Sequence, residues 1–188
     1  VTDLAARMRH LEQQLRQTLS FARPLELRLA TCHAGELLGR VSRAVAPVMK
    51  RAGVSLELRV DPDSPCFRAD PLRLEEVLTN LAMNAAEMLP PGGRVRMLAQ
   101  VGVSCCVRLE VQDDGDGVPV RQRESIFQPF VTSKAQGTGL GLPISRRIVE
   151  EHGGTLTLVD EPLGEDALPG ARFRICLPIQ SPKEGAAP

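Results

Sequence analysis

The stretch from residue 74 to 89 reads Leu74-Glu-Glu-Val-Leu-Thr-Asn80-Leu-Ala-Met-Asn84-Ala-Ala-Glu-Met-Leu89, with apolar side chains three and four residues apart. This spacing predicts a helix that buries one face. Asn80 and Asn84 follow Glu76 in steps of four, so the three share a neighbouring ridge. An amide oxygen of Asn84 can complete the shell of a magnesium ion held mainly by phosphates and water. By themselves, two helical asparagines more often have a hydrogen-bonding role in a cap or core.

The segments around this helix alternate between helical and strand patterns. Helices are expected at 34–52, 74–89 and 142–151, and strands at 54–60, 95–101, 105–111, 155–159 and 172–177. The runs 95–101 and 105–111 are joined near Gly102, which predicts an antiparallel hairpin. We therefore expect an α/β two-layer sandwich, with a mixed, mostly antiparallel sheet covered on one face by helices and preceded by a long N-terminal helix.

The first 24 residues carry a heptad pattern. Apolar side chains from Val1 to Ala22 alternate steps of three and four, as the a and d positions of a helical bundle do. Pro24 is expected to end this helix, because proline removes a backbone donor. An ordinary amphipathic helix packed on its own domain is the alternative. We expect a bundle helix at 1–24, a second domain at 25–180 and a flexible tail rich in Pro, Gly and Ala at 181–188.

Asp113-Asp-Gly-Asp-Gly117 closes the predicted hairpin. Its glycines allow a sharp turn and let a ligand come close to the backbone. A carboxylate at the end of a buried strand can accept a hydrogen bond from an exocyclic amine, such as N6 of adenine. A plain hairpin turn also fits the pattern. A calcium-binding EF-hand does not, because the glutamate at the twelfth position and the ligand spacing are missing.

Gly137-Thr-Gly-Leu-Gly141 comes directly before the predicted helix at 142–151. Free N–H groups and the helix dipole at such a terminus attract phosphate. A dinucleotide-binding fingerprint would need a strand immediately before the glycines, and residues 131–136 do not have a strand pattern. The phosphate-loop pattern G-x-x-x-x-G-K-[ST] is also absent from the sequence.

Composition limits the possible classes of protein. Hydrophobic residues make up 43% of the 188 residues and charged residues 24%, as in ordinary globular proteins. The 23 basic and 23 acidic side chains balance, which gives no reason to expect a nucleic acid or an anionic membrane as partner. Five scattered cysteines without C-x-x-C spacing suggest neither a zinc site nor a disulfide framework. We expect a cytoplasmic protein with reduced thiols.

Five motifs in a fixed order resemble those of the catalytic and ATP-binding region of bacterial sensor histidine kinases, within the wider Bergerat-fold ATPase group. They are the N box at 74–88, the G1 box at 113–117, the F box at 126–134, the G2 box at 137–142 and the final glycine motif at 170–173. The resemblance covers nearly everything from residue 1 to residue 178. It implies an ATP-dependent protein histidine kinase of a two-component system.

The resemblance also implies a role for individual residues. Asn84 would hold Mg²⁺, Asn80 would support the phosphates, and Asp113 would bind adenine in a pocket shaped by Gly115 and Gly117. The other expected nucleotide-binding residues lie in a short ATP lid: Lys134, Gly137, Thr138, Gly139, Leu140 and Gly141. Within that lid, the lysine would lie near the terminal phosphate. No residue of this chain is expected to act as a catalytic acid, base or nucleophile.

One position distinguishes a kinase from a hydrolase. Related ATPases of the gyrase and MutL types usually place a glutamate one helical turn before the metal asparagine, where it activates a water molecule as a general base. Here that position is Asn80, whose amide cannot take a proton. Glu76 lies a further turn away and is not expected to replace it. The terminal phosphoryl group would therefore be kept for a protein nucleophile.

The phosphoacceptor histidine is not expected within these 188 residues. Leu19-Ser-Phe-Ala-Arg-Pro24 resembles the end of the second helix of the dimerisation and histidine-phosphotransfer hairpin, whereas the acceptor belongs to the first helix. His10 lies on the wrong helix and is interpreted as a solvated side chain. His33 and His152 are interpreted as a loop or cap residue and a helix C-terminal residue.

The expected function is transfer of the γ-phosphoryl group of Mg-ATP to that histidine. The expected partners are ATP, a response regulator receiver domain and a second copy of the protein, which would dimerise through the N-terminal helix. Membrane contact is not expected for these residues, and an anchor elsewhere in the full protein is left open. Two alternatives remain: a catalytically silent module that binds ATP and dimerises, and an anti-sigma-type protein serine kinase.

Overall fold

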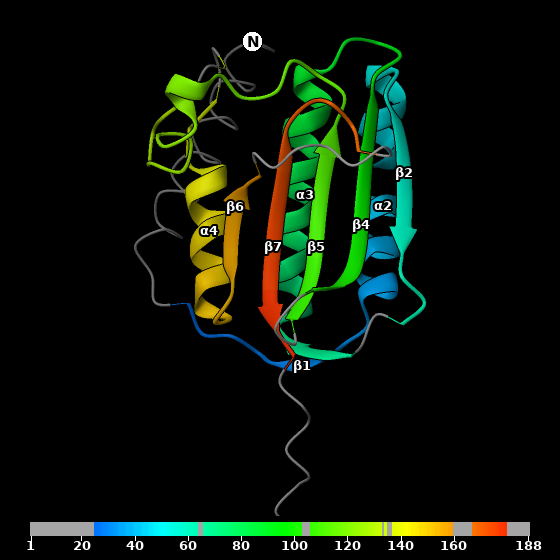
Figure 1. Cartoon of the computed structure of the whole chain (residues 1–188), viewed down its shortest axis with the longest axis vertical. Coiled ribbons are helices and arrows are strands. Elements are labelled where there is room, and N and C mark those ends of the chain that lie inside the picture. Colours follow the sequence, from blue (N-terminus) through cyan, green and yellow to red (C-terminus); the bar gives the residue numbers. More distant parts are fainter. Residues whose placement is uncertain are drawn as a thin grey trace, which may run out of the picture.

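The structure is a computed structural model that describes residues 25–63, 66–102, 106–132, 134, 137–159 and 167–179. The predicted bundle helix at 1–24 and the predicted tail at 181–188 lie outside the described residues. Helices stand on one face of a sheet, so the expected two-layer α/β architecture is confirmed (Figure 1).

The main sheet has the strand order β2-β4-β5-β7-β6. β2 (Ser55–Val60) runs parallel to β4 (Arg94–Gly102), whereas β5 (Cys106–Asp113), β7 (Arg172–Pro178) and β6 (Thr155–Leu158) extend it through antiparallel pairs. The parallel pair is joined through a helix, α3 (Pro71–Met88), because parallel strands need a crossover connection. The predicted β4–β5 hairpin and the mostly antiparallel sheet are both confirmed.

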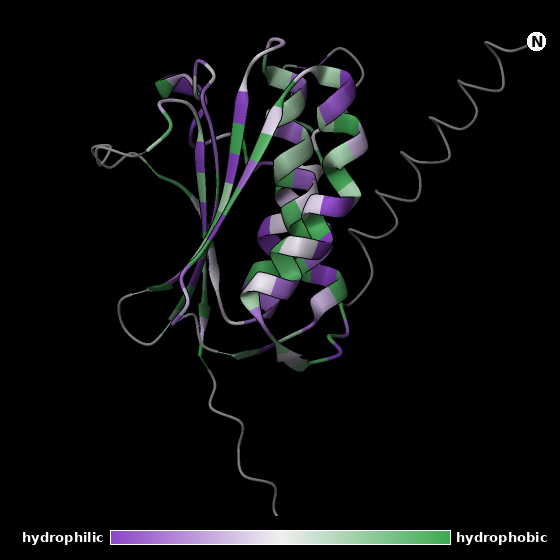
Figure 2. Ribbon diagram, turned by 90° about the vertical axis from the view of Figure 1, so that its right-hand side faces the viewer, coloured by the Kyte–Doolittle hydropathy of each residue, from purple (hydrophilic) through white to green (hydrophobic). Residues whose placement is uncertain are grey.

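The core lies between the sheet and its helices. α2 (Ala34–Ala52), α3 and α4 (Gly141–Glu151) bury apolar residues against the strands, and the helices form one layer beside the sheet (Figure 2). Alternate residues of β4 and β5 meet them and are at most 2% exposed: Val95, Met97, Ala99, Val107, Leu109 and Val111. Val101, the last residue of the strand predicted at 95–101, continues this alternation but is 45% exposed near the end of β4. Cys105, the first residue of the strand predicted at 105–111, lies outside the described residues.

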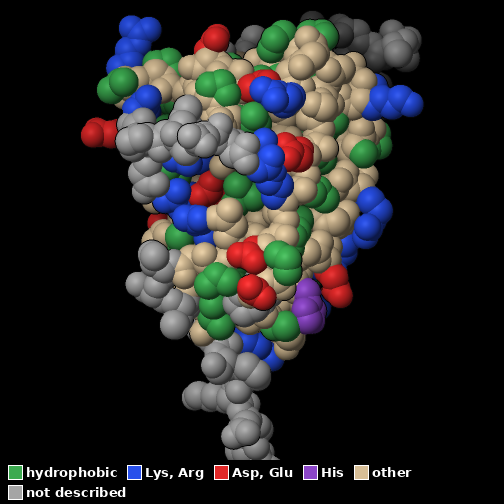
Figure 3. All heavy atoms as spheres, turned by 45° about the vertical axis from the view of Figure 1, so that its right-hand side comes forward, with side chains coloured by type: hydrophobic (Ala, Val, Ile, Leu, Met, Phe, Trp, Pro, Cys, Tyr) green, Lys and Arg blue, Asp and Glu red, His purple; other side chains and the backbone are tan. Residues whose placement is uncertain are grey.

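The opposite face of the sheet carries paired charges. Arg96 Nε lies 2.8 Å from Glu57 Oε2, and Arg174 Nε lies 2.6 Å from Glu110 Oε1. Positive and negative side chains are interspersed on the side of the molecule seen in Figure 3. None of the helices in the described part of the chain combines the length and apolar content that crossing a bilayer requires.

α3 is the helix predicted from the stretch at 74–89, and it starts three residues earlier than that stretch. Asp70 is its N-cap, where Oδ1 accepts hydrogen bonds from the N–H groups of Leu72 and Arg73 at 3.1 and 3.2 Å. Pro71 follows in the first turn, where a missing N–H costs nothing. The predicted apolar face of α3 is buried throughout: Leu74, Val77, Leu78, Leu81, Ala82 and Ala85.

Two features at the base of the fold were not predicted. β1 (Ala30–Cys32) and β3 (Phe67–Ala69) form a separate two-stranded antiparallel sheet. His152 does cap the C-terminus of α4, but it is buried and joins two helices. Its Nε2 accepts from the backbone N–H of Asp70 at 2.9 Å, and its Nδ1 donates to the Ile148 carbonyl at 2.7 Å. Hydrogen bonds at both ring nitrogens therefore hold this side chain between α4 and the start of α3.

Replacing Asp70 with alanine is expected to lower the free energy of unfolding by about 1–2 kcal/mol at neutral pH, because the N-cap of α3 is lost. Burial opposes ionisation of Asp70, but N–H groups of Arg28, Arg73 and Leu72 outweigh it, so its pKa is below the ordinary 3.8. The stabilisation is therefore complete above about pH 4 and fades as the pH falls through the lower folded-state value. Urea unfolding at pH 7 and pH 3 measures both effects. The exposed Asp63→Ala variant is the control, and an equal loss at both pH values would contradict the assignment.

Candidate functional site

A cavity of about 830 Å³ opens between α3, the end of β5 and the start of α4. Its size is typical of ligand-binding pockets. Ten of the eleven residues expected to bind the nucleotide line it: Asn80, Asn84, Asp113, Gly115, Gly117, Lys134, Gly137, Thr138, Gly139 and Gly141. Leu140 is the exception, because its side chain is buried and does not line the cavity. These ten residues, spread from residue 80 to residue 141 in the sequence, thus meet at one place.

Asp113 is held at the end of β5 by backbone groups. Its Oδ1 accepts hydrogen bonds from the N–H groups of Gly115 and Ala171, each at 3.0 Å. Its own N–H donates to the Ala171 carbonyl at 3.0 Å, which continues the pairing with the β7 side of the sheet. Burial raises the pKa of Asp113 above the ordinary 3.8, although the two N–H groups oppose that effect. Oδ1 is thus occupied by backbone donors, whereas Oδ2 has no hydrogen-bond partner among the described residues.

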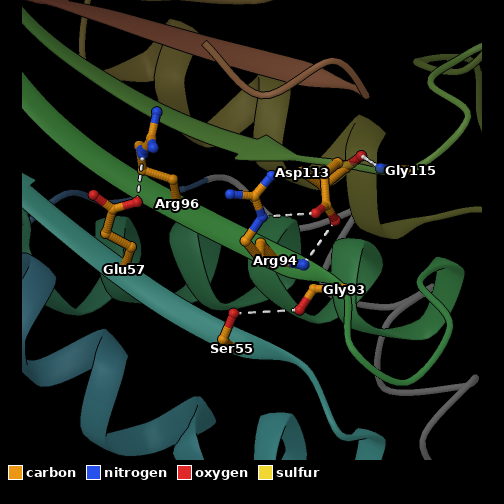
Figure 4. A network of polar contacts seen from close by, with 8 residues as sticks. Ser55, Glu57, Gly93, Arg94, Arg96, Asp113 and Gly115 are labelled. Carbon is orange, nitrogen blue, oxygen red and sulfur yellow. Dashed lines mark hydrogen bonds and ion pairs between the residues drawn. The ribbon is translucent and has the colours of Figure 1, made fainter. Parts of the chain in front are cut away.

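The network around Asp113 continues to its neighbour, away from the cavity. Asp114 accepts from the backbone N–H of Arg94 at 2.7 Å and from its Nε at 2.9 Å. In Figure 4, Arg94 lies beside the Asp113–Gly115 bond, and Arg96, further along β4, pairs with Glu57 of the neighbouring strand β2. The two adjacent aspartates therefore differ in role: Asp113 lines the cavity, and Asp114 fixes the start of β4.

Gly170 comes so close to Asp113 that no side chain fits. Its N–H donates to the Asp113 carbonyl at 2.9 Å. A Cβ atom added at Gly170 would lie 2.6 Å from the Gly115 nitrogen and 2.7 Å from the Asp113 carbonyl oxygen, and would also overlap Asp113 Oδ1. The final glycine motif is therefore explained by contact with the G1 box.

Asn80 ties α3 to α4. Its Nδ2 donates to Ser145 Oγ at 3.0 Å, and its Oδ1 would lie 2.5 Å from a Cβ atom placed on Gly141. Ser145 is 2% exposed and was not identified from the sequence, because a single serine on a helix gives no local signal. Asn80 therefore lines the cavity and at the same time fixes where α4 begins.

Asn84, one turn further along α3, meets the lysine of the expected lid. Lys134 Nζ donates to Asn84 Oδ1 at 2.8 Å and also forms an ion pair with Glu87. Glu87 lines the cavity and was likewise not identified from the sequence. Glu76 does not line it and instead pairs with Arg73, Nη1 to Oε2, at 2.9 Å.

Apolar side chains form part of the cavity wall. None of them was identified as a site residue from the sequence. Val118, Ile126 and Val131 lie in the loop between β5 and α4, which has no periodic pattern. The others lie on regular elements: Met83 and Met88 on α3, Leu142 on α4 and Phe173 on β7.

Phe127 anchors the F box to the domain. It is 8% exposed, and its ring meets the Phe173 ring edge-on with centroids 6.2 Å apart. The guanidinium carbon of Arg146, on α4, lies 3.7 Å from the centre of the Phe127 ring. Phe130, by contrast, is 69% exposed, has a positive φ of 65°, and donates its N–H to the Gly139 carbonyl at 3.1 Å. The F box and the glycine-rich G2 box are thus joined directly.

Comparison with known proteins agrees with this geometry. The family described as histidine kinase-, DNA gyrase B- and HSP90-like ATPases matches residues 69–181. Sensor histidine kinase ZraS of Escherichia coli (strain K12) is 31% identical over 169 residues, which cover 90% of this chain and 35% of ZraS. Alginate biosynthesis sensor protein KinB of Pseudomonas aeruginosa is 34% identical over 156 residues, which cover 82% of this chain and 25% of KinB. The chain thus spans about a third of the length of ZraS and a quarter of the length of KinB.

Two solved structures have the same fold. The nucleotide-free catalytic domain of histidine kinase ThkA is 29% identical, with a TM-score of 0.69 over 82% of this chain and 97% of that one. Full-length ShkA in complex with AMPPNP is 30% identical, with a TM-score of 0.82 over 96% of this chain and 38% of that one. The chain therefore belongs to the family of histidine kinase-, DNA gyrase B- and HSP90-like ATPases, within which it is the ATP-binding catalytic region of a bacterial sensor histidine kinase.

Proposed function

We propose that this chain binds Mg-ATP and transfers its γ-phosphoryl group to a histidine of a dimerisation and phosphotransfer hairpin. The acceptor histidine lies outside the 188 residues in this proposal. One observation carries it: a single cavity unites the Asp113 carboxylate, the Asn84 amide and the Lys134 ammonium, and no carboxylate occupies the position of Asn80.

The adenine base would bind at the end of the cavity that Asp113 lines. Because Oδ1 already accepts two backbone N–H groups, Oδ2 is the oxygen that would accept a hydrogen bond from adenine N6. Apolar side chains such as Met83, Ile126 and Phe173 offer the base an apolar wall. Gly115 and Gly117 would let the ring approach the backbone.

The triphosphate would lie toward the N-terminus of α4. The lid residues Gly137, Thr138 and Gly139 line this part of the cavity, and α4 begins at Gly141. Unpaired N–H groups of the first helical turn and the helix dipole favour a phosphate there. The Lys134 ammonium would neutralise the terminal phosphate, and Asn80 would keep α4 in register with α3 through Ser145.

The residues present fit a magnesium ion at Asn84. Asn84 Oδ1 lines the cavity and already attracts one cation, the Lys134 ammonium. Mg²⁺ prefers oxygen ligands such as this amide oxygen, with substrate phosphates and water completing its shell. When bound, Mg²⁺ would neutralise charge on the phosphate oxygens. Asn84 would be its protein ligand.

The proposed reaction is transfer rather than hydrolysis. The bond from the γ-phosphorus to the β,γ-bridging oxygen breaks, a bond to a histidine ring nitrogen forms, and ADP leaves. The chain would contribute positioning and charge neutralisation, which are the main protein contributions to phosphoryl transfer. Neither Asn80 nor Glu76 supplies a base for water, since the former is an amide and the latter pairs with Arg73 outside the cavity.

The proposal extends to the organisation of the full protein. Residues 1–24 would belong to the bundle, through which two copies dimerise, and residues 25–180 would form the catalytic domain. The phosphoryl group would pass from histidine to a response regulator receiver domain. ThkA has been solved in complex with the response regulator protein TrrA.

Phosphorylation in trans tests the proposed reaction. The chain is mixed with Mg-[γ-³²P]ATP and a separately supplied hairpin from a sensor kinase, and label on the hairpin is followed over time. We expect acid-labile label on the hairpin and little free phosphate. A hairpin whose histidine is replaced by alanine should take up none. Tight ATP binding without transfer, in reactions where a complete kinase labels the same hairpin, would favour the silent ATP-binding module.

A further inference from the structure

The Lys134 ammonium is hydrogen-bonded to Asn84 Oδ1, the oxygen that would ligate the proposed metal ion. Its Nζ lies 2.8 Å from Asn84 Oδ1 and is paired at the same time with the Glu87 carboxylate. The two acceptors are three residues apart on α3, so they face the same side of the helix. All three side chains line the cavity, and Lys134 is 29% exposed.

An ammonium group and Mg²⁺ on one amide oxygen would repel each other strongly, because two cations a few ångströms apart are poorly screened in a partly buried cavity. Lys134 must therefore leave Asn84 when the metal arrives. Leaving also breaks the ion pair with Glu87, so the lysine needs a new anionic partner. A γ-phosphate supplies one in Mg-ATP, whereas Mg-ADP has none at that position.

We propose that the Lys134 ammonium occupies the metal position at Asn84 in the nucleotide-free protein, and that Glu87 is the positioning residue that keeps it there. Exchange of the ammonium for Mg²⁺ then makes the site prefer Mg-ATP to Mg-ADP. The inference rests on the proposed function, because it assumes that Asn84 is the metal ligand. Binding of either nucleotide breaks the Lys134–Glu87 ion pair. Only Mg-ATP, through its γ-phosphate, gives Lys134 a new anionic partner.

Isothermal titration calorimetry of Mg-ATP and Mg-ADP against three variants tests the exchange. Glu87→Gln should increase the affinity for both nucleotides by about two- to fivefold, because binding no longer has to break a partly exposed ion pair, which contributes free energy in that range. Lys134→Met should tighten Mg-ADP to a similar degree. The same variant should weaken Mg-ATP by about tenfold, because a charge-assisted contact with the γ-phosphate is lost. In the double variant, Glu87→Gln should have no further effect.

Glu76→Gln is the matched control, since Glu76 lies on the same helix, is half exposed and pairs with Arg73 outside the cavity. It should change neither affinity. Thermal unfolding of each variant checks that the fold is intact. A purely structural role for Glu87 would not tighten binding, so the sign of the effect distinguishes the two roles.

Three results would overturn the inference. Weaker binding of both nucleotides to Glu87→Gln would show that Glu87 helps to hold the metal instead. An unchanged Mg-ADP affinity in Lys134→Met would show that the lysine does not compete with the metal. If Glu87→Gln still tightened nucleotide binding in protein that also carries Lys134→Met, the Lys134–Glu87 ion pair would not be the cause of the tightening. Wild-type protein that binds neither nucleotide would refute the proposed function itself, and the exchange with it.

Discussion

Asp113→Asn is expected to weaken ATP binding by about 10- to 100-fold, because a buried charge-assisted hydrogen bond to adenine N6 would be replaced by two donors that face each other. The asparagine Oδ1 can still accept from Gly115 and Ala171, so the local fold is kept. Its amide nitrogen, however, takes the place of Oδ2 and would point a donor at the adenine amine, which is itself a donor. The dissociation constant, measured by calorimetry with Mg-ATP, reports this change.

The adjacent Asp114→Asn variant is the control, because Asp114 pairs with Arg94 and does not line the cavity. It should bind Mg-ATP as the wild type does. If Asp113→Asn also binds normally, the adenine assignment is wrong.

The same interaction predicts a pH dependence. Only ionised Asp113 offers Oδ2 as an acceptor, and burial raises its pKa above 3.8. ATP affinity of the wild type should therefore fall as the pH is lowered toward that raised value, because binding must first remove a proton from the carboxyl group. Asp113→Asn cannot titrate, so its affinity should lack this component. Equal pH profiles for the two proteins would contradict the role of Asp113.

Gly170→Ala is expected to have an even larger effect on ATP binding, with affinity reduced more than about 100-fold. The new Cβ atom would lie 2.6 Å from the Gly115 nitrogen and 2.7 Å from the Asp113 carbonyl oxygen. These are backbone atoms at the end of β5, so the overlap is relieved only by moving Asp113 away from its two N–H donors. Overpacking of this kind also costs about 1–3 kcal/mol of unfolding free energy. Calorimetry and urea unfolding measure the two effects separately.

Gly35→Ala is a suitable control for Gly170→Ala. Gly35 lies in the first turn of α2, where an added Cβ atom would come no closer than 3.5 Å, to Val60. Alanine favours helix over glycine, so we expect unchanged ATP affinity and a small gain in stability. A Gly170→Ala protein that binds ATP normally would mean that the final glycine motif does not support the adenine site.

Local pattern was enough to predict the helices and the strands of the main sheet. The apolar positions of α3 repeat at helical spacing over four turns, and β4 and β5 alternate over several residues, because one face of each element is buried. The short strands β1 and β3 have three residues each and were missed. Such a segment is too short for a periodic pattern, and only its partner strand defines it.

The residues of the site also divide into those that the sequence predicted and those that it did not. Asn80, Asn84, Asp113 and the glycines could be identified because each belongs to a short motif next to a predicted element. Glu87 and Ser145 could not be, since each acquires its role from a side chain 47 or 65 positions away. The apolar wall of the cavity lies partly in a loop without periodicity, so residues such as Ile126 had no signal of their own.

The residue types that form the site can therefore be recognised from short stretches of the sequence, whereas their positions relative to one another cannot. The order of its motifs, the amide at position 80 and the alternation of its strands can be read along the chain, because they depend on residue type and on neighbours a few positions away. Which oxygen of Asp113 remains for a ligand, and which cation rests on Asn84, depends on groups that only the folded chain brings within hydrogen-bonding distance. Hydrogen bonds act over about 3 Å, so contacts between distant segments are settled when the layers pack together.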